Sequence, residues 1–193
     1  MRRAELERKT AETEISVVLD LDGSGSGEAA TGLGFLDHML TTLAKHSGMD
    51  LTVRASGDVG IDDHHTVEDC AIVLGRALDD ALGDRSGITR FGYAYAPLDE
   101  SLSRAVVDLS GRPWPEVSIG FNRSSIGDVA TENIVHFFRS FAIEGRMALH
   151  VDTIRGDNDH HMAESAFKAL ALALRQAVTP RDDGVPSTKG SLR

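Results

Sequence analysis

The chain has 193 residues, of which 41% are hydrophobic, and these values predict a globular protein of one domain or two small ones. No apolar run is long enough for a membrane span, and a net charge of −10 argues against general binding to nucleic acid or anionic membranes. The single cysteine, Cys70, excludes an intramolecular disulfide framework, and with no export signal at the start we expect a cytoplasmic protein.

The first half of the chain alternates predicted strands and helices. Residues 1–14 are charged and show no periodicity, so no element is predicted there. Further elements follow in order: a strand over 15–21, a second strand ending near Gly32, a helix over 35–44, a strand over 51–55 and a long amphipathic helix over 62–82. The glycine-rich turn between the two strands lacks the lysine ending of a phosphate loop. A break in the pattern at 83–87 is the candidate boundary.

The second half repeats this plan. Strands are predicted over 90–96, 102–109 and 115–120, followed by a helix over 131–143, a strand over 147–154 and a helix over 159–178. Each half runs strands, helix, strand, long helix, so we predict an α+β fold made of an internally duplicated unit with sheets packed against helices. The predicted divisions are a first half-repeat over 1–87, a second over 88–179 and a tail over 180–193.

A pair of adjacent histidines begins each of the two long helices. Three residues of one helix correspond to three of the other at a constant offset of 96 residues: His64, His65 and Glu68, and His160, His161 and Glu164. Consecutive helical residues point about 100° apart, so adjacent histidines serve two different ions more readily than one. The glutamate, three and four positions further on, is expected to lie near both imidazoles. Two copies favour a paired metal site over two solvated helix starts rich in Asp and His.

A further histidine on each shorter helix completes the candidate ligand set. The eight candidates are His38, His64, His65, Glu68, His136, His160, His161 and Glu164. Divided evenly, they give two ions with three imidazoles and one carboxylate each. Imidazole and carboxylate without thiolate suit Zn, Mn, Fe or Ni. Four protein ligands would close a tetrahedral zinc but leave two positions open on an octahedral ion such as Mn²⁺, which a substrate can fill.

Several segments resemble, in motif order, those of the imidazoleglycerol-phosphate dehydratase family. They are Phe35-Leu-Asp-His-Met-Leu, Asp62-Asp-His-His-Thr-Val-Glu-Asp, Asp108-Leu-Ser-Gly-Arg-Pro, Asn158-Asp-His-His with Phe167-Lys-Ala, and Pro186-Ser-Thr-Lys-Gly. The resemblance runs from about residue 8 to residue 192. It departs from the family pattern at Asp157, where the family usually has Glu, and at His46-Ser-Gly-Met. Neither departure touches a candidate ligand.

The resemblance implies an activity and an assembly. The activity is dehydration of imidazole glycerol phosphate to imidazole acetol phosphate in histidine biosynthesis, with two Mn²⁺ ions per active site that hold the substrate as imidazolate. The assembly is a large homo-oligomer of twenty-four subunits whose active sites form between subunits, so the eight ligands need not come from one chain. No nucleic-acid or membrane partner is implied.

The resemblance also assigns residues that carry no signal of their own. Glu12 matches the family's proton-abstracting base, although it is one charge among many in a polar N-terminus. The phosphate-binding positions of the family fall on Arg90, Arg112, Lys168, Ser187 and Lys189. Arginine and lysine suit phosphate, and an acidic protein needs such a local basic group to bind an anion.

Two other classes of protein are compatible with the ligand set alone. A dinuclear metal-dependent phosphoester hydrolase would direct a metal-bound water at a phosphoester, but it favours bridging carboxylates, and the only obvious ones here are two glutamates. A non-enzymatic metal-binding shell would use the ions only to join subunits. Phosphate release without an imidazole product would identify the first, and bound metal without turnover of any imidazole substrate would identify the second.

Overall fold

The two halves of the chain have the same order of elements. The computed structural model describes residues 2–182, 184, 185, 187, 188, 190 and 192. The first half contains β1 (Arg3–Lys9), β2 (Thr13–Asp20), β3 (Gly27–Ala30), α1 (Gly34–Ser47), β4 (Asp50–Gly57) and α2 (His64–Leu82). The second contains β5 (Phe91–Leu98), β6 (Ser101–Asp108), β7 (Trp114–Ser118), the short strands β8 (Ser125–Ile126) and β9 (Val129–Ala130), α3 (Thr131–Glu144), β10 (Ala148–Arg155) and α4 (Asp159–Ala177).

Each half forms a four-stranded sheet of identical topology. The strand order is β1-β2-β4-β3 in one sheet and β5-β6-β10-β7 in the other. In both, the first three strands pair antiparallel and the last pairs parallel to its neighbour. The fold is therefore α+β with an internal duplication, as the repeated sequence pattern predicts. The predicted break at 83–87 falls between α2 and β5.

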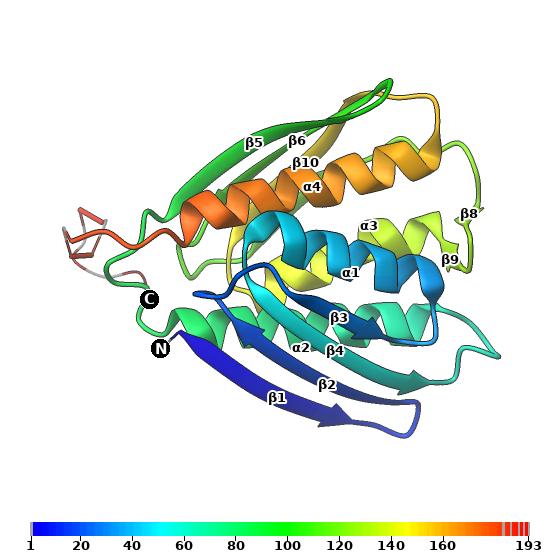
Figure 1. Ribbon diagram of the computed structural model, residues 1–193, viewed down its shortest axis with the longest axis horizontal. Coiled ribbons are helices and arrows are strands. Elements are labelled where there is room, and N and C mark those ends of the chain that lie inside the picture. Colours follow the sequence, from blue (N-terminus) through cyan, green and yellow to red (C-terminus); the bar gives the residue numbers. More distant parts are fainter. Residues whose placement is uncertain (1, 183, 186, 189, 191, 193) are drawn as a thin grey trace.

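The four helices lie between the two sheets (Figure 1). Helices α2 and α4 pack on the sheets of their own halves, and across the middle α1 contacts α4 while α2 contacts α3. Each helix–helix contact thus joins one half of the chain to the other. Two glycines allow elements to pack this closely because glycine has no side chain. A Cβ on Gly75 of α2 would lie 2.8 Å from the Phe141 carbonyl oxygen of α3, and a Cβ on Gly92 of β5 would lie 1.9 Å from the Ala173 carbonyl oxygen of α4.

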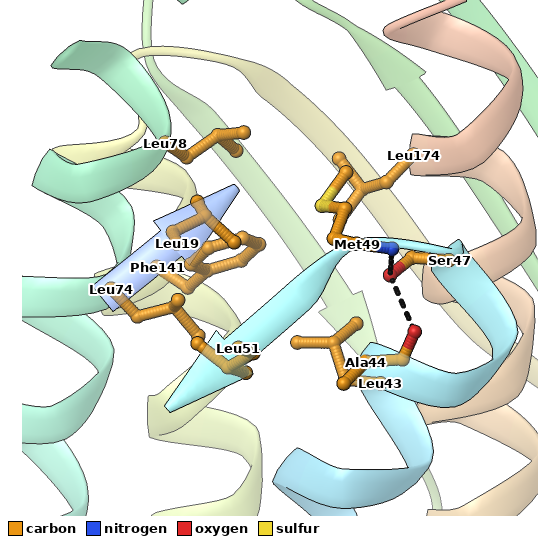
Figure 2. A pocket seen from close by; sticks show the side chains of 10 residues that line it. All are labelled: Leu19, Leu43, Ala44, Ser47, Met49, Leu51, Leu74, Leu78, Phe141 and Leu174. Atoms are coloured by element: carbon orange, nitrogen blue, oxygen red, sulfur yellow. Dashed lines mark hydrogen bonds between the residues drawn. The ribbon is translucent and has the colours of Figure 1, made fainter. Parts of the chain in front are cut away.

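A small cavity lies in the apolar core between the halves (Figure 2). Leucine side chains from both halves surround it, together with Met49 and Phe141, and its volume is about 10 Å³. That is at the lower limit for a single water molecule, and an apolar space of this kind stays dry. Ser47 adds a hydroxyl, but this group already donates to the Ala44 carbonyl and accepts from the Met49 amide. The cavity is a packing imperfection and not a ligand site.

Strand β1 is an element that the sequence pattern did not predict. Residues 3–9 were expected to be irregular, but they pair antiparallel with β2 along the edge of the first sheet. Strand β1 shows no clear alternation of apolar and polar residues. Its outward positions are all charged, as at Glu5 and Glu7, and Arg8 occupies one inward position. The Arg8 guanidinium forms an ion pair with buried Asp69 of α2, so a charge replaces the expected apolar contact. Charged edge strands also resist pairing with other sheets.

The other predicted elements agree with the structure to within a few residues. The largest shift at a site-bearing end is in α2, which begins at His64 and not at residue 62. Within the described part of the chain, no helix is both long and apolar enough to cross a membrane.

Candidate metal centre and active site

Asparagine and aspartate side chains fix where the two histidine-bearing helices begin. The Asp62 carboxylate accepts the His64 amide at 2.8 Å, and the Asn158 side chain accepts the His160 amide at 2.9 Å. Both bonds satisfy amides at a helix start, which lack partners within the helix. As a result, the paired histidines occupy equivalent positions in the first turn of each helix.

One cluster of metal-binding groups joins α1 to α4, and we call it the α1–α4 cluster. Its members are His38, His160 and Glu164, whose ligand atoms lie within 4.8 Å of one another. His38 Nε2 is 3.0 Å and His160 Nε2 is 3.2 Å from the same glutamate oxygen. Two imidazole nitrogens therefore converge on one carboxylate, although His38 comes from the first half of the chain and the other two residues from the second.

The second cluster joins α2 to α3, and we call it the α2–α3 cluster. It consists of His64, Glu68 and His136, with ligand atoms again within 4.8 Å of one another. His136 Nε2 is 2.9 Å from one Glu68 oxygen, and His64 Nε2 is 3.8 Å from the other. This cluster is the counterpart of the first with the halves exchanged, since here the single histidine comes from the second half.

The remaining two candidate ligands, His65 and His161, point away from both clusters of their own chain. Each ring is nearly perpendicular to that of the preceding histidine, with interplanar angles of 75° and 87°. Adjacent helical positions diverge in this way. Within one chain, each glutamate contacts the first histidine of its pair and a histidine from the other half. Glu164 also lies close enough to His161 to interact with it electrostatically.

Carboxylates outside the predicted set hold these two diverging histidines. His65 Nδ1 lies 3.0 Å from Asp58, and His161 Nδ1 lies 2.8 Å from Glu100. The hydrogen bond to Asp58 raises the pKa of His65, and that to Glu100 raises the pKa of His161. In return, His161 and the Asn158 amide hold the pKa of Glu100 far below its usual range.

The surroundings of Glu164 favour its ionised form. Burial alone would raise its pKa, but hydrogen bonds from Lys168 at 2.8 Å and from His38 outweigh burial and lower the pKa to about 2. A carboxylate that stays ionised at neutral pH is the form that binds a cation. Lys168 thus lies beside the α1–α4 cluster, one helical turn beyond the glutamate.

Glu12 lies close to His65 and apart from the two clusters. It occupies the tight turn between β1 and β2, where its amide donates to the Thr10 hydroxyl at 3.1 Å. Its carboxylate is more than half exposed and lies 3.8 Å from His65 Nε2. The turn therefore presents a solvated carboxylate beside the outward nitrogen of a candidate ligand.

Among the other predicted phosphate-binding residues, Arg90 lies at the opposite end of α4 from the α1–α4 cluster. The Arg90 amide donates to the Ala177 carbonyl at the end of α4, and its guanidinium pairs with Asp108 at 2.7 and 3.0 Å. His160 lies in the first turn of the same helix, so about 25 Å of helix separates it from Arg90. Arg112, in the turn after β6, is exposed, and the Ser187 amide donates to the Val185 carbonyl within the tail. Lys189 lies outside the described residues.

Asp58, Glu100 and Asn133 all contact candidate ligands but were not predicted from the sequence. Asn133 of α3 accepts a hydrogen bond from His64 Nδ1 at 2.9 Å. Each is separated from its histidine by a loop, a hairpin or a helix boundary, so no fixed spacing reveals it. The internal repeat offers only a partial signal: Glu100 has a counterpart of the same type in Glu12, which also directly precedes the second strand of its sheet, whereas the helix position equivalent to Asn133 is Phe35.

The fold and the two clusters define a class of protein: a duplicated α+β unit that presents paired imidazole–carboxylate centres. The family model described as imidazoleglycerol-phosphate dehydratase matches residues 31–174. The chain is 58% identical over its whole length to a protein of that name from Phytophthora nicotianae, of which it spans 43%. It is 54% identical to that from Cereibacter sphaeroides, with both chains fully covered. The crystal structure from Staphylococcus aureus N315 matches with a TM-score of 0.84 and 38% identity, covering 92% of this chain and 99% of that one.

These matches extend over most of the chain and include every element that carries a cluster residue. The chain belongs to the imidazoleglycerol-phosphate dehydratase family. It is accordingly a hydro-lyase of histidine biosynthesis.

Proposed function

We propose that this enzyme dehydrates imidazole glycerol phosphate to imidazole acetol phosphate with the help of two Mn²⁺ ions per active site. The observation that carries the proposal is the pair of equivalent clusters, each with two imidazoles and one carboxylate converging within 4.8 Å. A substrate that itself contains an imidazole matches this donor set, because imidazole nitrogen is the ligand that both clusters already use.

The residues of the clusters fit a divalent cation. Nitrogen and carboxylate oxygen atoms suit Mn²⁺, and the absence of thiolate argues against a closed structural zinc site. In each cluster one carboxylate oxygen accepts a close contact from an imidazole Nε2, as at Glu164 with His38 and at Glu68 with His136. These nitrogens already point to a common centre, so a bound ion requires little rearrangement. The bound ions would act as Lewis acids and as a template that orients the substrate.

The third imidazole of each centre is proposed to come from a neighbouring subunit. Each cluster holds two histidines, whereas even division of the eight candidates gives three. His65 and His161 each direct Nε2 away from their own chain's clusters. Supplying these nitrogens to other copies completes both centres and makes metal binding depend on assembly.

The positions of the phosphate-binding residues support the same arrangement. About 25 Å separates Arg90 from the His160 end of α4, which is far longer than the substrate. Arg90 of one chain therefore serves the centre of another, and we assign Arg112, Ser187 and Lys189 to the same phosphate on the family resemblance, while Lys168 lies beside the α1–α4 cluster of its own chain. Active sites between subunits reconcile these distances.

An exposed aromatic surface supports a large homo-oligomer, which we propose to contain twenty-four subunits. The outward side chains Phe91, Tyr93 and Tyr95 of β5 are 53%, 67% and 57% exposed, and Trp114 of β7 is 64% exposed. Exposed aromatic patches of this kind mark interaction surfaces. Another copy of the chain is the partner that a shared active site requires.

The proposed mechanism assigns the proton transfer to Glu12. The product has its ketone on the carbon next to the ring-bearing carbon, so the hydroxyl leaves the ring-bearing carbon and Glu12 takes the proton from the carbon beside it. A carbon–carbon double bond forms as these two bonds break, and the resulting enol relaxes to the ketone. Lys168 and the two arginines hold the phosphate, whose binding energy orients the reacting carbons.

The test is a direct assay of imidazole glycerol phosphate with purified protein before and after chelation. We expect formation of imidazole acetol phosphate that is lost on chelation and restored by Mn²⁺. Release of inorganic phosphate without the ketone would instead identify a phosphoester hydrolase. Full metal occupancy with no turnover would identify a metal-binding shell.

A further inference from the structure

Glu100 holds the ring of His161 from the hairpin between β5 and β6. It ends the turn between β5 and β6, and its Oε2 accepts a hydrogen bond from His161 Nδ1 at 2.8 Å. Its other oxygen accepts from the Asn158 amide at 2.9 Å and from the Ser101 hydroxyl at 3.0 Å. Both oxygens are therefore engaged, and the side chain is held in one orientation.

Asp58 performs the equivalent task for His65 in a different way. It lies in the loop between β4 and α2, and its two oxygens are 3.3 and 3.0 Å from His65 Nδ1. The Asp58 carboxylate has no other hydrogen-bond donor among the described residues. This carboxylate is free to rotate while it keeps its contact with the imidazole.

The geometry points to Glu100 and Asp58 as positioning residues that keep the proton of each diverging histidine on Nδ1. The lone pair of Nε2 is then available to a metal ion held by another subunit. The inference rests on the proposed metal-dependent function. A carboxylate that accepts the second ring N–H of a ligand histidine fixes both its tautomer and its orientation.

The glutamates at the β1–β2 and β5–β6 hairpins contact different nitrogens of their histidines and are assigned different roles. Glu12 and Glu100 both end the turn after the first strand of their sheets, directly before β2 and β6. Glu100 binds His161 Nδ1, whereas Glu12 lies 3.8 Å from His65 Nε2. Because Asp58 already occupies the Nδ1 side of His65, the hairpin glutamate of the first half is left for another role. That role is the proton transfer assigned to Glu12.

Replacement of Glu100 by glutamine tests the tautomer directly. The Asn158 amide and the Ser101 hydroxyl both donate to the same oxygen, so the single amide oxygen of Glu100→Gln would face them. Its NH₂ group would then face His161 Nδ1 and require a lone pair there. The proton moves to Nε2, where it blocks metal binding. In Asp58→Asn the amide can instead rotate its oxygen toward His65, so this tautomer is kept.

The experiment measures Mn²⁺ affinity of the assembled full-length protein together with solid-state ¹⁵N NMR of labelled histidine at basic pH, where the rings are neutral. We expect Glu100→Gln to lower the Mn²⁺ affinity by about 10–100-fold and to shift one histidine to the Nε2–H tautomer. Asp58→Asn should have a smaller effect. The matched control is Asp99→Asn, since Asp99 is the hairpin neighbour of Glu100 and lies 3.9 Å from His161 Nε2.

A second variant separates positioning from a merely structural role. Glu100→Ala removes the acceptor without imposing a donor, so it should bind Mn²⁺ better than Glu100→Gln does. A structural role for the side chain predicts the reverse order, because glutamine preserves its volume. Unchanged affinity and tautomer in Glu100→Gln, or an equal loss in Asp99→Asn, would overturn the inference. Absence of Mn²⁺ binding and turnover in the unmodified protein would refute the proposed function itself.

Discussion

The two halves of the chain share one topology and one set of cluster positions but differ in what surrounds them. In the α2–α3 cluster the ring of His64 is held by a hydrogen bond to Asn133. The helix position equivalent to Asn133 in the first half is Phe35, whose ring packs edge-on against His160 with 5.2 Å between centroids. The two clusters therefore have the same arrangement of converging side chains, but different residues orient their histidine rings.

A second difference concerns charge beside the glutamate of each cluster. Lys168 follows Glu164 by one helical turn and pairs with it, whereas the position equivalent to Lys168 after Glu68 is Ile72. Only one of the two equivalent clusters therefore has this lysine next to it. The substrate carries a single phosphate, so a binding site with two similar centres needs such an asymmetry to fix which way the substrate lies.

The outer faces of the two sheets differ most. Charged residues such as Glu5 and Glu7 line the first sheet's outer edge, while tyrosines and Trp114 cover the second. These different compositions are those expected of a solvated face and of the subunit interface proposed above. The two sheets thus share one topology but differ in the composition of their outer faces.

The largest effect is expected on the assembly. Tyr93→Glu places a charge in the aromatic face of the second sheet, and we expect the homo-oligomer to fall to smaller species with loss of bound metal. Light scattering after size-exclusion chromatography measures this change. Ser16→Glu adds the same group to the outer face of the first sheet and should leave the assembly intact. A full-size assembly in the Tyr93 variant would show that the aromatic face is not an interface.

The next effect concerns the two hairpin glutamates. Glu12→Gln keeps the side-chain volume but removes the proton acceptor, so turnover should fall by about 10²–10⁴-fold while metal content and substrate affinity are retained. This behaviour is opposite to that expected of Glu100→Gln, which acts through metal affinity. Glu14→Gln, at an exposed position two residues away, serves as the control. If Glu12→Gln turned over normally, the base would have to be another carboxylate.

The ligand set was predictable from sequence because it is duplicated. The constant offset between the two histidine pairs identified six candidates, and a histidine on each shorter helix added two more; the structure brings six of these eight into the two clusters. Which halves combine was not predictable: α1 packs on α4 and not on its sequence neighbour α2, so each cluster crosses between the repeats. The order of the helices along the chain does not reveal which of them pack together.

The supporting residues were missed for a related reason. Asp58, Glu100 and Asn133 reach their histidines through loops or across helix contacts, and none belongs to the repeated His-His-x-x-Glu pattern. Strand β1 was missed because a hydrophobic pattern was expected where the fold places charges. Hydrophobic periodicity predicts strands that bury apolar side chains. It does not predict a strand such as β1, where the ion pair of Arg8 with Asp69 takes the place of an apolar contact.

Lys168 provides a smaller test of the asymmetry between clusters. Lys168→Met removes the proposed charged hydrogen bond to phosphate, worth about 1.5–3 kcal/mol, so the Michaelis constant should rise by about 10–100-fold with metal content unchanged. Steady-state kinetics and elemental analysis measure the two quantities. Lys45→Met, on an exposed position of α1, is the control. A parallel fall in metal content would mean that Lys168 orients Glu164 and does not bind phosphate.

The smallest expected effect comes from changing the residues that orient the rings of His64 and His160. Asn133→Ala removes the acceptor of His64 Nδ1, so we expect the Mn²⁺ affinity of the α2–α3 cluster to fall by about tenfold, at the lower end for such supporting contacts. Phe35→Leu keeps most of the bulk beside His160 and loses only the edge-on ring contact, worth about 0.5–1.5 kcal/mol.

Titration with Mn²⁺, followed by the signal of the free ion in electron paramagnetic resonance, reports both affinities. The asparagine variant should retain one tight class of sites and acquire one weaker class, because only one of the two clusters uses this hydrogen bond. The phenylalanine variant should show the weaker change in the other class. Equal weakening of both classes by Asn133→Ala would mean that the two centres bind metal as one coupled unit, and the distinction between them would then lie only in the phosphate-binding lysine.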